Sequence, residues 1–430
     1  MISFDQVSRI GFGCYRIGAN SRAHREALKH ALASGCNLVD TSSNYAGGQS
    51  ERVVGAVLSE INSSDVFVIT KAGYMQGDDV ALLPDLVSGG LPEEEVVPIS
   101  DDSRHCIHPD FLAIQLERSR ARLSRDWIDG FLLHNPEYYF NRGSRDVSKE
   151  EYYRRIKKAF EFLEGCVSRG IIRYYGVSSN TLPLPSSAAN GTSLVELLRV
   201  AREISLDHHF KLIQFPYNLI ETGAAEPHHA GVSLIGLARQ NSITTFANRP
   251  LNAKTPEGPI RIATYDAEIQ ELDEARDSTF LDHSIGLIHG RLRAHGSDDD
   301  PMDFPIVRFL STDWMKMPNA DAVEEIFEGH FFPFLRHLYQ GVPPVEEMDT
   351  YARLYRYALL YSKRMMTAQG HALRERLSDR GLIAADIDRS LPSLACEAYF
   401  KAGIDHVLVG MRSRGYVDEL KELFRPVSVA

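Results

Sequence analysis

The sequence predicts an α/β protein built on a (β/α)8 barrel, the TIM barrel, and three observations support this. Short apolar runs rich in β-branched residues recur along the chain. Segments with apolar residues at three- and four-residue spacing, typical of amphipathic helices, lie between these runs. Apolar strands that alternate with helices indicate a parallel sheet covered by helices, and eight such strands form a barrel.

The expected strands are near-continuous apolar runs, as in "VFVIT" at 66–70, which indicates burial on both faces. In chain order they cover residues 9–14, 37–42, 66–73, 128–134, 172–179, 211–216, 242–250 and 406–411. Between and after them, helices are expected at 22–34, 50–60, 110–124, 150–169, 194–205, 229–240 and 416–424. Gly35 follows the first of these helices, as glycine does at many helix ends.

Two segments interrupt this alternation. Residues 74–107 follow the third strand and are predicted to be a long irregular loop with one short helix. Residues 252–390 follow the seventh strand and carry helical patterns at about 265–276, 321–340 and 345–379. The expected barrel therefore covers residues 1–251 and 391–430, with 252–390 as a mostly helical insertion.

The insertion begins after a strand, at the face where barrel enzymes bind substrates. We therefore expect it to form a substrate lid or subdomain, with an element for oligomerisation as the alternative.

Composition limits the function classes. The formal net charge of −11 argues against broad binding of nucleic acid or of an anionic membrane. Five scattered cysteines without a CxxC pair argue against a disulfide framework, and "HCIH" at 105–108 lacks the pattern of a structural zinc site. No secretion signal or membrane span is evident. We expect a cytoplasmic protein with a small-molecule partner and no bound metal, and leave its oligomeric state open.

Four side chains with complementary chemistry follow neighbouring strands. Asp40 lies near the end of the second expected strand, with Tyr45 just beyond it, while Lys71 and His134 close the third and fourth. Because the carboxyl ends of barrel strands share one face, these side chains are expected to converge there.

This set suits hydride transfer to a carbonyl group. The developing alkoxide needs a proton, and a free tyrosine, with a pKa near 10, gives one up reluctantly. A cationic lysine lowers the pKa of a neighbouring phenol, and an aspartate keeps that lysine charged. We therefore expect Tyr45 to act as general acid/base, assisted by Lys71 and Asp40, while His134 orients the substrate oxygen.

Seven stretches occur in the order of a known family: "GFGCYRIG" 11–18, "NLVDTSSNYAGGQSERVVG" 37–55, "VITKAGY" 68–74, "FLLHNPE" 131–137, "YYGVSSN" 174–180, "LIQFPYNLIE" 212–221 and "VLVGMRSRGYVDEL" 407–420. With these motifs the sequence resembles the aldo-keto reductase family everywhere except in the two interruptions. The resemblance implies a (β/α)8 reductase that uses a nicotinamide dinucleotide, normally NADP(H), without metal or flavin. It also implies the roles given above to the four catalytic candidates.

The resemblance further implies a cofactor site. Ser178 and Gln214 match residues that hold the nicotinamide carboxamide, and Ser179 stands where asparagine is usual, with Asn180 as its substitute. The other cofactor residues that it implies are Gly13 of the first strand, Leu251 after the seventh, and, after the eighth, Gly410, Met411, Arg412, Ser413 and Tyr416. Tyr416 departs from the family, because an arginine or glutamine is common at its position.

The sequence departs from the family where "ANRPL" at 247–251 replaces the usual "AYSPL". Asn248 therefore stands in place of an aromatic residue. Arg249 is expected to pair with an anion of the cofactor or substrate, with a structural salt bridge as the alternative. Arg412 and Arg414 suit a 2′-phosphate, which favours NADP(H) and leaves NAD(H) open.

The sequence thus predicts an NADP-dependent reductase of an aldehyde, ketone or aldose, or the alcohol or aldose dehydrogenase that runs the same reaction in reverse. One alternative is a catalytically weak nicotinamide-binding protein that senses redox state or regulates a partner. Another is a metal-dependent barrel hydrolase or isomerase that uses Asp40 and His134.

Overall fold

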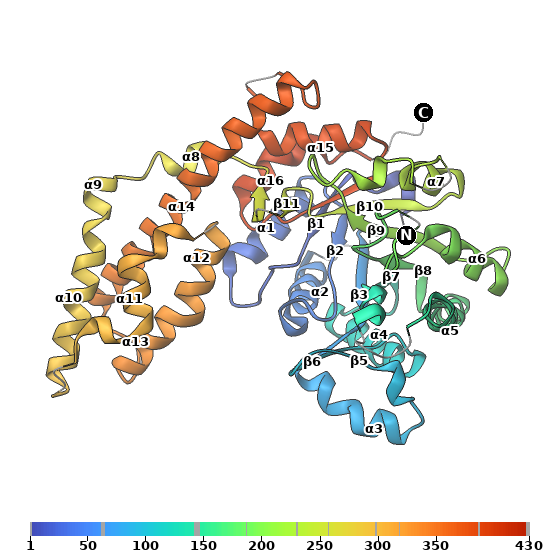
Figure 1. Ribbon diagram of the computed structural model, residues 1–430, viewed down its shortest axis with the longest axis horizontal. Helices are drawn as coiled ribbons and strands as arrows, with labels where there is room; N and C mark the ends of the chain where they lie inside the picture. Colours follow the sequence, from blue (N-terminus) through green and yellow to red (C-terminus); the bar gives the residue numbers. More distant parts are fainter. Residues whose placement is uncertain are drawn as a thin grey trace. The chain divides into compact units, whose positions relative to one another are not determined.

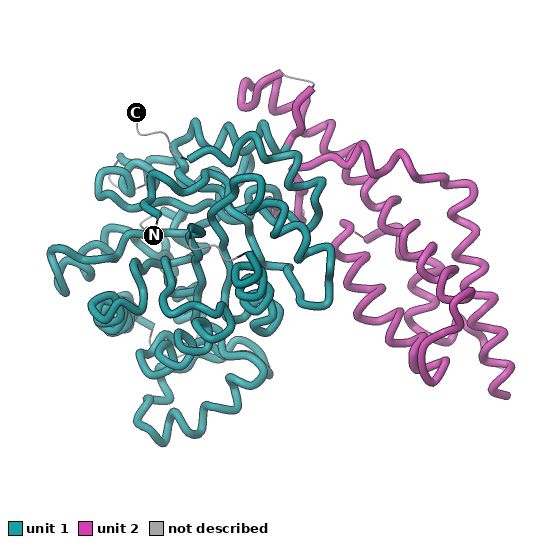
Figure 2. The backbone as a smooth tube through the Cα atoms, turned by 180° about the vertical axis from the view of Figure 1, so that it is seen from behind, with its two compact units in different colours: residues 1–253, 392–430 teal, residues 254–391 magenta. Residues whose placement is uncertain are grey.

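The protein is described from a computed structural model covering residues 2–61, 65–141, 147–185, 187–228, 231–256, 258–296, 299–317, 319–385 and 388–426. The chain divides into two compact units, coloured separately in Figure 2. The first comprises Met1–Ala253 and Pro392–Ala430, and the second comprises Lys254–Leu391.

The first unit is a closed barrel of eight strands, which confirms the predicted fold (Figure 1). Around the barrel the order is β1, β2, β3, β7, β8, β9, β10 and β13, and the paired neighbours run parallel. The bounds are β1 Ile10–Gly13, β2 Leu38–Asp40, β3 Phe67–Ala72, β7 Ile128–His134, β8 Ile172–Ser178, β9 Phe210–Pro216, β10 Thr244–Asn248 and β13 His406–Val409.

Apolar side chains fill the barrel. Phe67, Ile69, Leu132, Leu212 and Phe246, from four different strands, belong to one buried cluster. Every residue of β3 and β7 is buried, as their near-continuous apolar sequences predict.

Gly176 permits a close approach of β8 to β9, because a Cβ atom there would lie 2.0 Å from the carbonyl oxygen of Leu212.

Helices follow the barrel strands, with bounds α1 Arg22–Ala33, α2 Gln49–Ile61, α4 Pro109–Leu123, α5 Lys149–Ser168, α6 Leu194–Ile204, α7 Leu234–Gln240, α15 Leu391–Lys401 and α16 Arg414–Leu420. Helix α7 begins five residues later than predicted, because Ser233 caps it by accepting a hydrogen bond from the Gly236 amide. The first two residues of that predicted helix, 229 and 230, lie outside the described residues.

The segment after β3 is more regular than predicted. It contains the expected short helix, α3 Leu83–Ser88, and also a small antiparallel sheet in the order β4, β6, β5. These strands are β4 Tyr74–Gln76, β5 Val97–Ser100 and β6 Ser103–His105. Each has only three or four residues, too few for an apolar alternation to stand out in the sequence.

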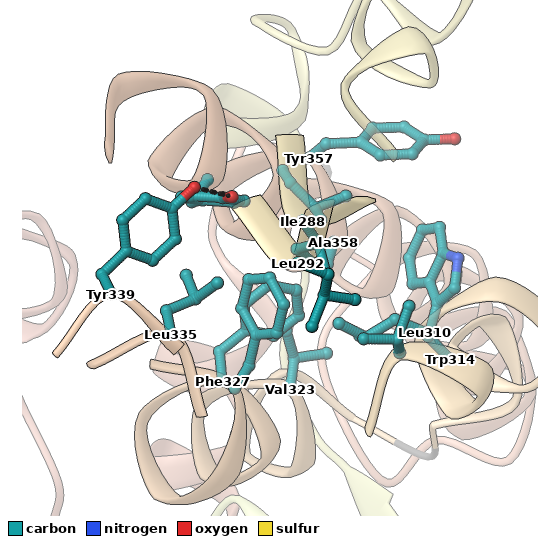
Figure 3. Packing of buried hydrophobic residues seen from close by; sticks show 14 residues of the cluster. Ile288, Leu292, Leu310, Trp314, Val323, Phe327, Leu335, Tyr339, Tyr357 and Ala358 are labelled. Carbon is teal, nitrogen blue, oxygen red and sulfur yellow. Dashed lines mark hydrogen bonds between the residues drawn. The ribbon is translucent and has the colours of Figure 1, made fainter. Parts of the chain in front are cut away.

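The second unit is mostly helical and has its own core (Figure 3). Its helices are α8 Asp266–Ile269, α9 Glu274–Asp277, α10 Thr279–Ala294, α11 Pro305–Thr312, α12 Ala320–Ile326, α13 Phe332–Leu338 and α14 Val345–Asp379, and a ribbon of β11 Asn252–Thr255 and β12 Gly258–Arg261 precedes them. Leu292 of α10, Leu310 of α11 and Tyr357 of α14 pack in one buried cluster. Among the described residues, no helix is both long and apolar enough to span a membrane.

Candidate active site

Lys71 is the centre of a buried polar cluster at the carboxyl ends of β2 and β3. Its ammonium group lies 2.8 and 2.9 Å from the two carboxylate oxygens of Asp40 and 2.8 Å from the carbonyl oxygen of Thr41. It also donates to the phenolic oxygen of Tyr45 at 3.3 Å. The structure thus brings Asp40, Tyr45 and Lys71 together. The three ammonium protons of Lys71 are all donated to acceptors within this cluster.

Local backbone geometry places Tyr45 over Lys71. The register aligns Asp40 with Gly13 on one side and with Ile69 on the other. After β2 the chain turns sharply through Ala46 and Gly47, whose φ values are 48° and 61°. The 3-10 turn Tyr45–Gly48 leads directly into α2, so the phenol stays beside the strand ends.

The electrostatics of the cluster differ from the sequence prediction. Burial lowers the pKa of Lys71, although Asp40 opposes that shift. Burial, followed by the charge of Asp40, raises the pKa of Tyr45 well above its ordinary value. The prediction that Lys71 lowers the pKa of Tyr45 is therefore wrong, because Asp40 offsets the lysine charge and the phenol is removed from water. The Tyr45 hydroxyl is therefore protonated at neutral pH.

His134, at the end of β7, lies beside this cluster. Its ring meets that of Tyr45 edge to face, with centroids 5.9 Å apart, and its Nδ1 atom is 3.0 Å from the hydroxyl oxygen of Ser42. Burial and then the charge of Lys71 lower the pKa of His134 well below its ordinary value. The imidazole is therefore neutral at physiological pH.

The small sheet after β3 supports His134, and sequence reasoning missed this. The ring of Tyr74 packs edge to face on the His134 ring at 4.9 Å. The buried His105 side chain donates through Nε2 to the backbone oxygen of His134 at 2.7 Å. Gly73 makes room for this bond, since a Cβ atom there would lie 2.6 Å from that oxygen. The sequence signal for His105 is "HCIH" at 105–108, whose spacing does not indicate a contact with His134.

Gln214, on β9, links the predicted cofactor residues to the cluster around Lys71. Its Nε2 donates to Asp40 at 2.8 Å, and its Oε1 accepts from Ser178 at 3.1 Å. Asn248 lies 3.4 Å from the same Oε1 atom. The carboxamide of Gln214 is thus fixed between two strand ends and the carboxylate of Asp40.

The side chain of Ser179 does not join this group, because its hydroxyl lies 3.1 Å from the hydroxyl oxygens of both Thr181 and Thr192, and only its backbone N–H donates to the backbone oxygen of Gln214. Asn180, considered as its substitute, gives its backbone N–H to Glu137 at 2.8 Å. Its side-chain amide donates to Asn135 at 3.2 Å.

Arg249, expected to bind an anion, already has a carboxylate partner. It takes a left-handed backbone conformation with φ 52°, and its Nη2 donates to Glu221 at 2.6 Å. Two polar atoms at this end of β10, Asn248 Oδ1 and Arg249 Nε, are buried without a hydrogen-bond partner within the described residues. Leu251 is buried just beyond.

The loop after β13 carries the remaining predicted cofactor residues. Gly13 packs closely on this strand, since a Cβ atom there would lie 3.3 Å from the backbone of Val409. After Gly410, the side chain of Met411 is fully buried, and Arg412 follows it. Ser413 caps α16 by accepting from the Tyr416 amide at 3.4 Å.

Arg414 is exposed and donates to Glu26 at 2.9 Å. Across the described part of the chain, no three His, Cys, Asp or Glu side chains are grouped so that they could hold a metal ion.

Comparison with known proteins points to one family. The model of the Aldo/keto reductase family matches residues 9–236. Aldo-keto reductase yakc [NADP(+)] of Schizosaccharomyces pombe is 28% identical over 256 residues, which is 58% of this chain and 60% of that protein. D-threo-aldose 1-dehydrogenase of a Pseudomonas species is 27% identical over 228 residues, 51% of this chain and 60% of that protein.

Among solved structures, a glycerol dehydrogenase of Gluconobacter oxydans is 17% identical with a TM-score of 0.48, over 97% of this chain and 86% of that one. The chain spans 60% of the length of each of the two curated relatives named above.

Proposed function

Because the chain belongs to the aldo/keto reductase family, we propose that it moves a hydride between NADP(H) and the reacting carbon of an aldehyde, ketone or aldose, or of the corresponding alcohol. The observation that carries this proposal is the buried Lys71, which joins the carboxylate of Asp40 to the phenol of Tyr45. In this cluster the Tyr45 hydroxyl can supply a proton at the carboxyl ends of β2 and β3.

Each residue of the cluster has a distinct task in this proposal. In reduction, the hydride adds to the carbonyl carbon while the Tyr45 hydroxyl gives its proton to the carbonyl oxygen. Lys71 then donates a hydrogen bond to the phenolate that remains, and Asp40 keeps the lysine charged in its buried position. In oxidation, the phenolate takes the alcohol proton while the hydride leaves the carbon.

The residues at the ends of β9 and β10 fit a nicotinamide dinucleotide. The unpartnered Asn248 Oδ1 suits the amide N–H of a carboxamide, and the unpartnered Arg249 Nε suits an anionic oxygen. Ser178 and Gln214 lie beside them, and we assign the 2′-phosphate to Arg412 and Arg414 of the loop after β13. Bound NADPH would supply the hydride. The name of the Schizosaccharomyces pombe relative, which specifies NADP(+), supports this choice over NAD(H).

Replacing Tyr45 with phenylalanine tests the proposal. Tyr45→Phe removes only the acidic hydroxyl, so carbonyl reduction should fall by about 10²-fold or more while NADPH binding, followed by fluorescence, persists. Tyr15→Phe is a matched control, because Tyr15 packs edge to face on Tyr45 but is 67% exposed. It should keep most of the activity.

Unchanged reduction in Tyr45→Phe would refute the role of the phenol. NADPH binding without turnover in the wild-type protein would favour the alternative of a redox sensor or regulatory protein.

A further inference from the structure

The helical unit contains a cavity that has no task in the proposed hydride transfer. Its volume is about 200 Å³, and its walls come from residues 314–317 and from helix α14. All of the lining residues belong to Lys254–Leu391, whereas every residue assigned to hydride transfer or to the cofactor belongs to the other unit. No residue of the cluster around Lys71 lines this cavity.

Methionines and aromatic rings make up most of the wall. Four of the nine methionines of the chain line the cavity, namely Met315, Met317, Met365 and Met366. Met315 is 52% exposed and Met365 is 48% exposed, so these two side chains do not serve to fill the core of the unit. Methionine side chains are flexible and polarizable, which allows them to adapt to a bound molecule.

The rings of Trp314 and Tyr361 form the aromatic part of the wall. Trp314, labelled in Figure 3, belongs to the core of the unit, and its ring meets that of Tyr361 edge to face with centroids 5.2 Å apart. Thioether sulfurs contact aromatic rings favourably, and aromatic rings pack favourably on one another. Both parts of the wall therefore favour an aromatic ligand over an aliphatic one of the same size.

The buried polar group of the wall is the hydroxyl of Ser362. This residue is 6% exposed, and its hydroxyl makes no hydrogen bond within the described residues, whereas Ser311 donates to the backbone oxygen of Val307. Among the described lining residues only Lys316 is charged, and it donates to Asp313. The wall thus offers a hydroxyl group and a balanced charge, which favours a neutral ligand with one hydrogen-bonding group.

We propose that this cavity binds a small neutral aromatic molecule that carries one hydroxyl or N–H group, such as a phenol or an indole. An apolar cavity of about 150 Å³ is large enough for benzene, so about 200 Å³ accommodates a ring with a further substituent. The ring packs against the methionines and Trp314, and its polar group forms a hydrogen bond with Ser362. The proposal does not depend on the reductase function, and its test needs no turnover.

Calorimetric titration of the full protein with p-cresol and with toluene tests the site. The probes share a ring and a methyl group, so p-cresol should bind about fivefold more tightly, the size expected for one hydrogen bond. Ser362→Ala should remove this difference and keep the affinity for toluene. Equal affinities in the wild-type protein, or no binding of p-cresol up to about 5 mM, would overturn the proposal. Tighter binding of 4-methylbenzoate than of p-cresol would overturn the assignment of a neutral ligand.

Ser284→Ala is the matched control. Ser284 is also a buried serine on a helix of this unit, its hydroxyl has no hydrogen bond within the described residues, and it does not line the cavity. The substitution should leave both affinities unchanged. An equal effect of Ser284→Ala and Ser362→Ala would show that the loss does not arise in the cavity and would overturn the proposal.

Carbon-13 NMR of the wild-type protein, labelled at its methionine methyl groups, locates p-cresol without relying on the fold of a variant. The ring current of bound p-cresol should shift the signals of the four methionines of the wall, whereas Met75 and Met411 of the barrel unit should not move. Replacement of single methionines by leucine is used only to identify the signals. Shifts confined to Met75 or Met411 would overturn the inference.

Discussion

At the scale of single residues, the site depends on how Lys71 is buried. Desolvation of an ammonium group is costly unless acceptors replace the lost water. Asp40, the Thr41 carbonyl and the Tyr45 hydroxyl provide those acceptors. The same burial raises the pKa of Tyr45, so the phenol stays protonated and the phenolate is disfavoured.

These pKa directions predict the pH dependence of the reaction. Reduction needs protonated Tyr45, and the pKa of Tyr45 is raised above its ordinary value, so kcat for reduction should be level from about pH 6 to 9. Oxidation needs the phenolate, so its kcat should rise with pH over that range. Initial rates at saturating substrate in both directions provide the measurement.

Glu137→Gln is a useful control for these profiles, because burial raises the pKa of Glu137 to about 7. It removes a group that titrates within the range and should leave both profiles unchanged. A fall in kcat for reduction centred near pH 7 in both proteins would contradict the assignment of Tyr45 as a donor of raised pKa.

Sequence reasoning identified the residues of this cluster because each follows a strand and carries a distinctive chemical group. It did not identify Ser42 or His105, since small polar residues and isolated histidines occur widely. Both are recognised only by their contacts with His134, which lies 92 residues from Ser42 and 29 residues from His105 in the sequence. It also predicted a lowered pKa for Tyr45, whereas burial raises that pKa. The sequence indicates which charged residues lie near the phenol but not how deeply the phenol is buried.

At the scale of elements, the small sheet after β3 packs against His134. β6 carries His105 to the backbone of His134, and β4 carries Tyr74 to its ring. The two strands are paired, with Tyr74 opposite His105, so the contacts depend on one another. The sequence indicates the length of this segment. It does not indicate the contacts with His134, because they depend on the pairing of β4 with β6, and strands this short leave no recognisable pattern.

Gly73→Ala should disturb this support. The added methyl group would lie 2.6 Å from the His134 oxygen and 2.7 Å from His105 Nε2, closer than real Cβ contacts allow. We expect kcat for reduction to fall by about tenfold, because displacement of an orienting group by a fraction of an ångström weakens catalysis. NADPH affinity should change little. Steady-state kinetics and fluorescence titration measure the two quantities.

Gly18→Ala is the control, because a Cβ atom there meets nothing within 4 Å. Unchanged kcat in Gly73→Ala would show that the contact between β6 and His134 has no catalytic role.

At the scale of the whole molecule, the helical unit Lys254–Leu391 is the main departure from a simple barrel. Its aromatic core is independent of the barrel core. The helical pattern at 345–379 predicts α14 to the residue, because this helix is long and strongly periodic. Helices α10 and α11 were missed.

We propose that this unit contributes to substrate binding as a lid, and its removal tests that role. Replacing residues 254–391 with a flexible Gly/Ser linker should raise KM for the carbonyl substrate or abolish turnover, while NADPH affinity stays within a few-fold. Steady-state kinetics and NADPH titration measure these effects. Unchanged kinetics with an altered molecular mass in solution would identify the unit as an oligomerisation element instead.

The central claim is that the cluster at Lys71 serves hydride transfer, and isotope transfer tests it most directly. The wild-type protein would be incubated with glyceraldehyde and NADPH deuterated at the transferable position of the nicotinamide, and the product alcohol examined by mass spectrometry. We expect one deuterium bound to the former carbonyl carbon, and formation of the deuterated alcohol should be suppressed in Tyr45→Phe. An alcohol without that deuterium, or equal formation in the variant, would contradict it.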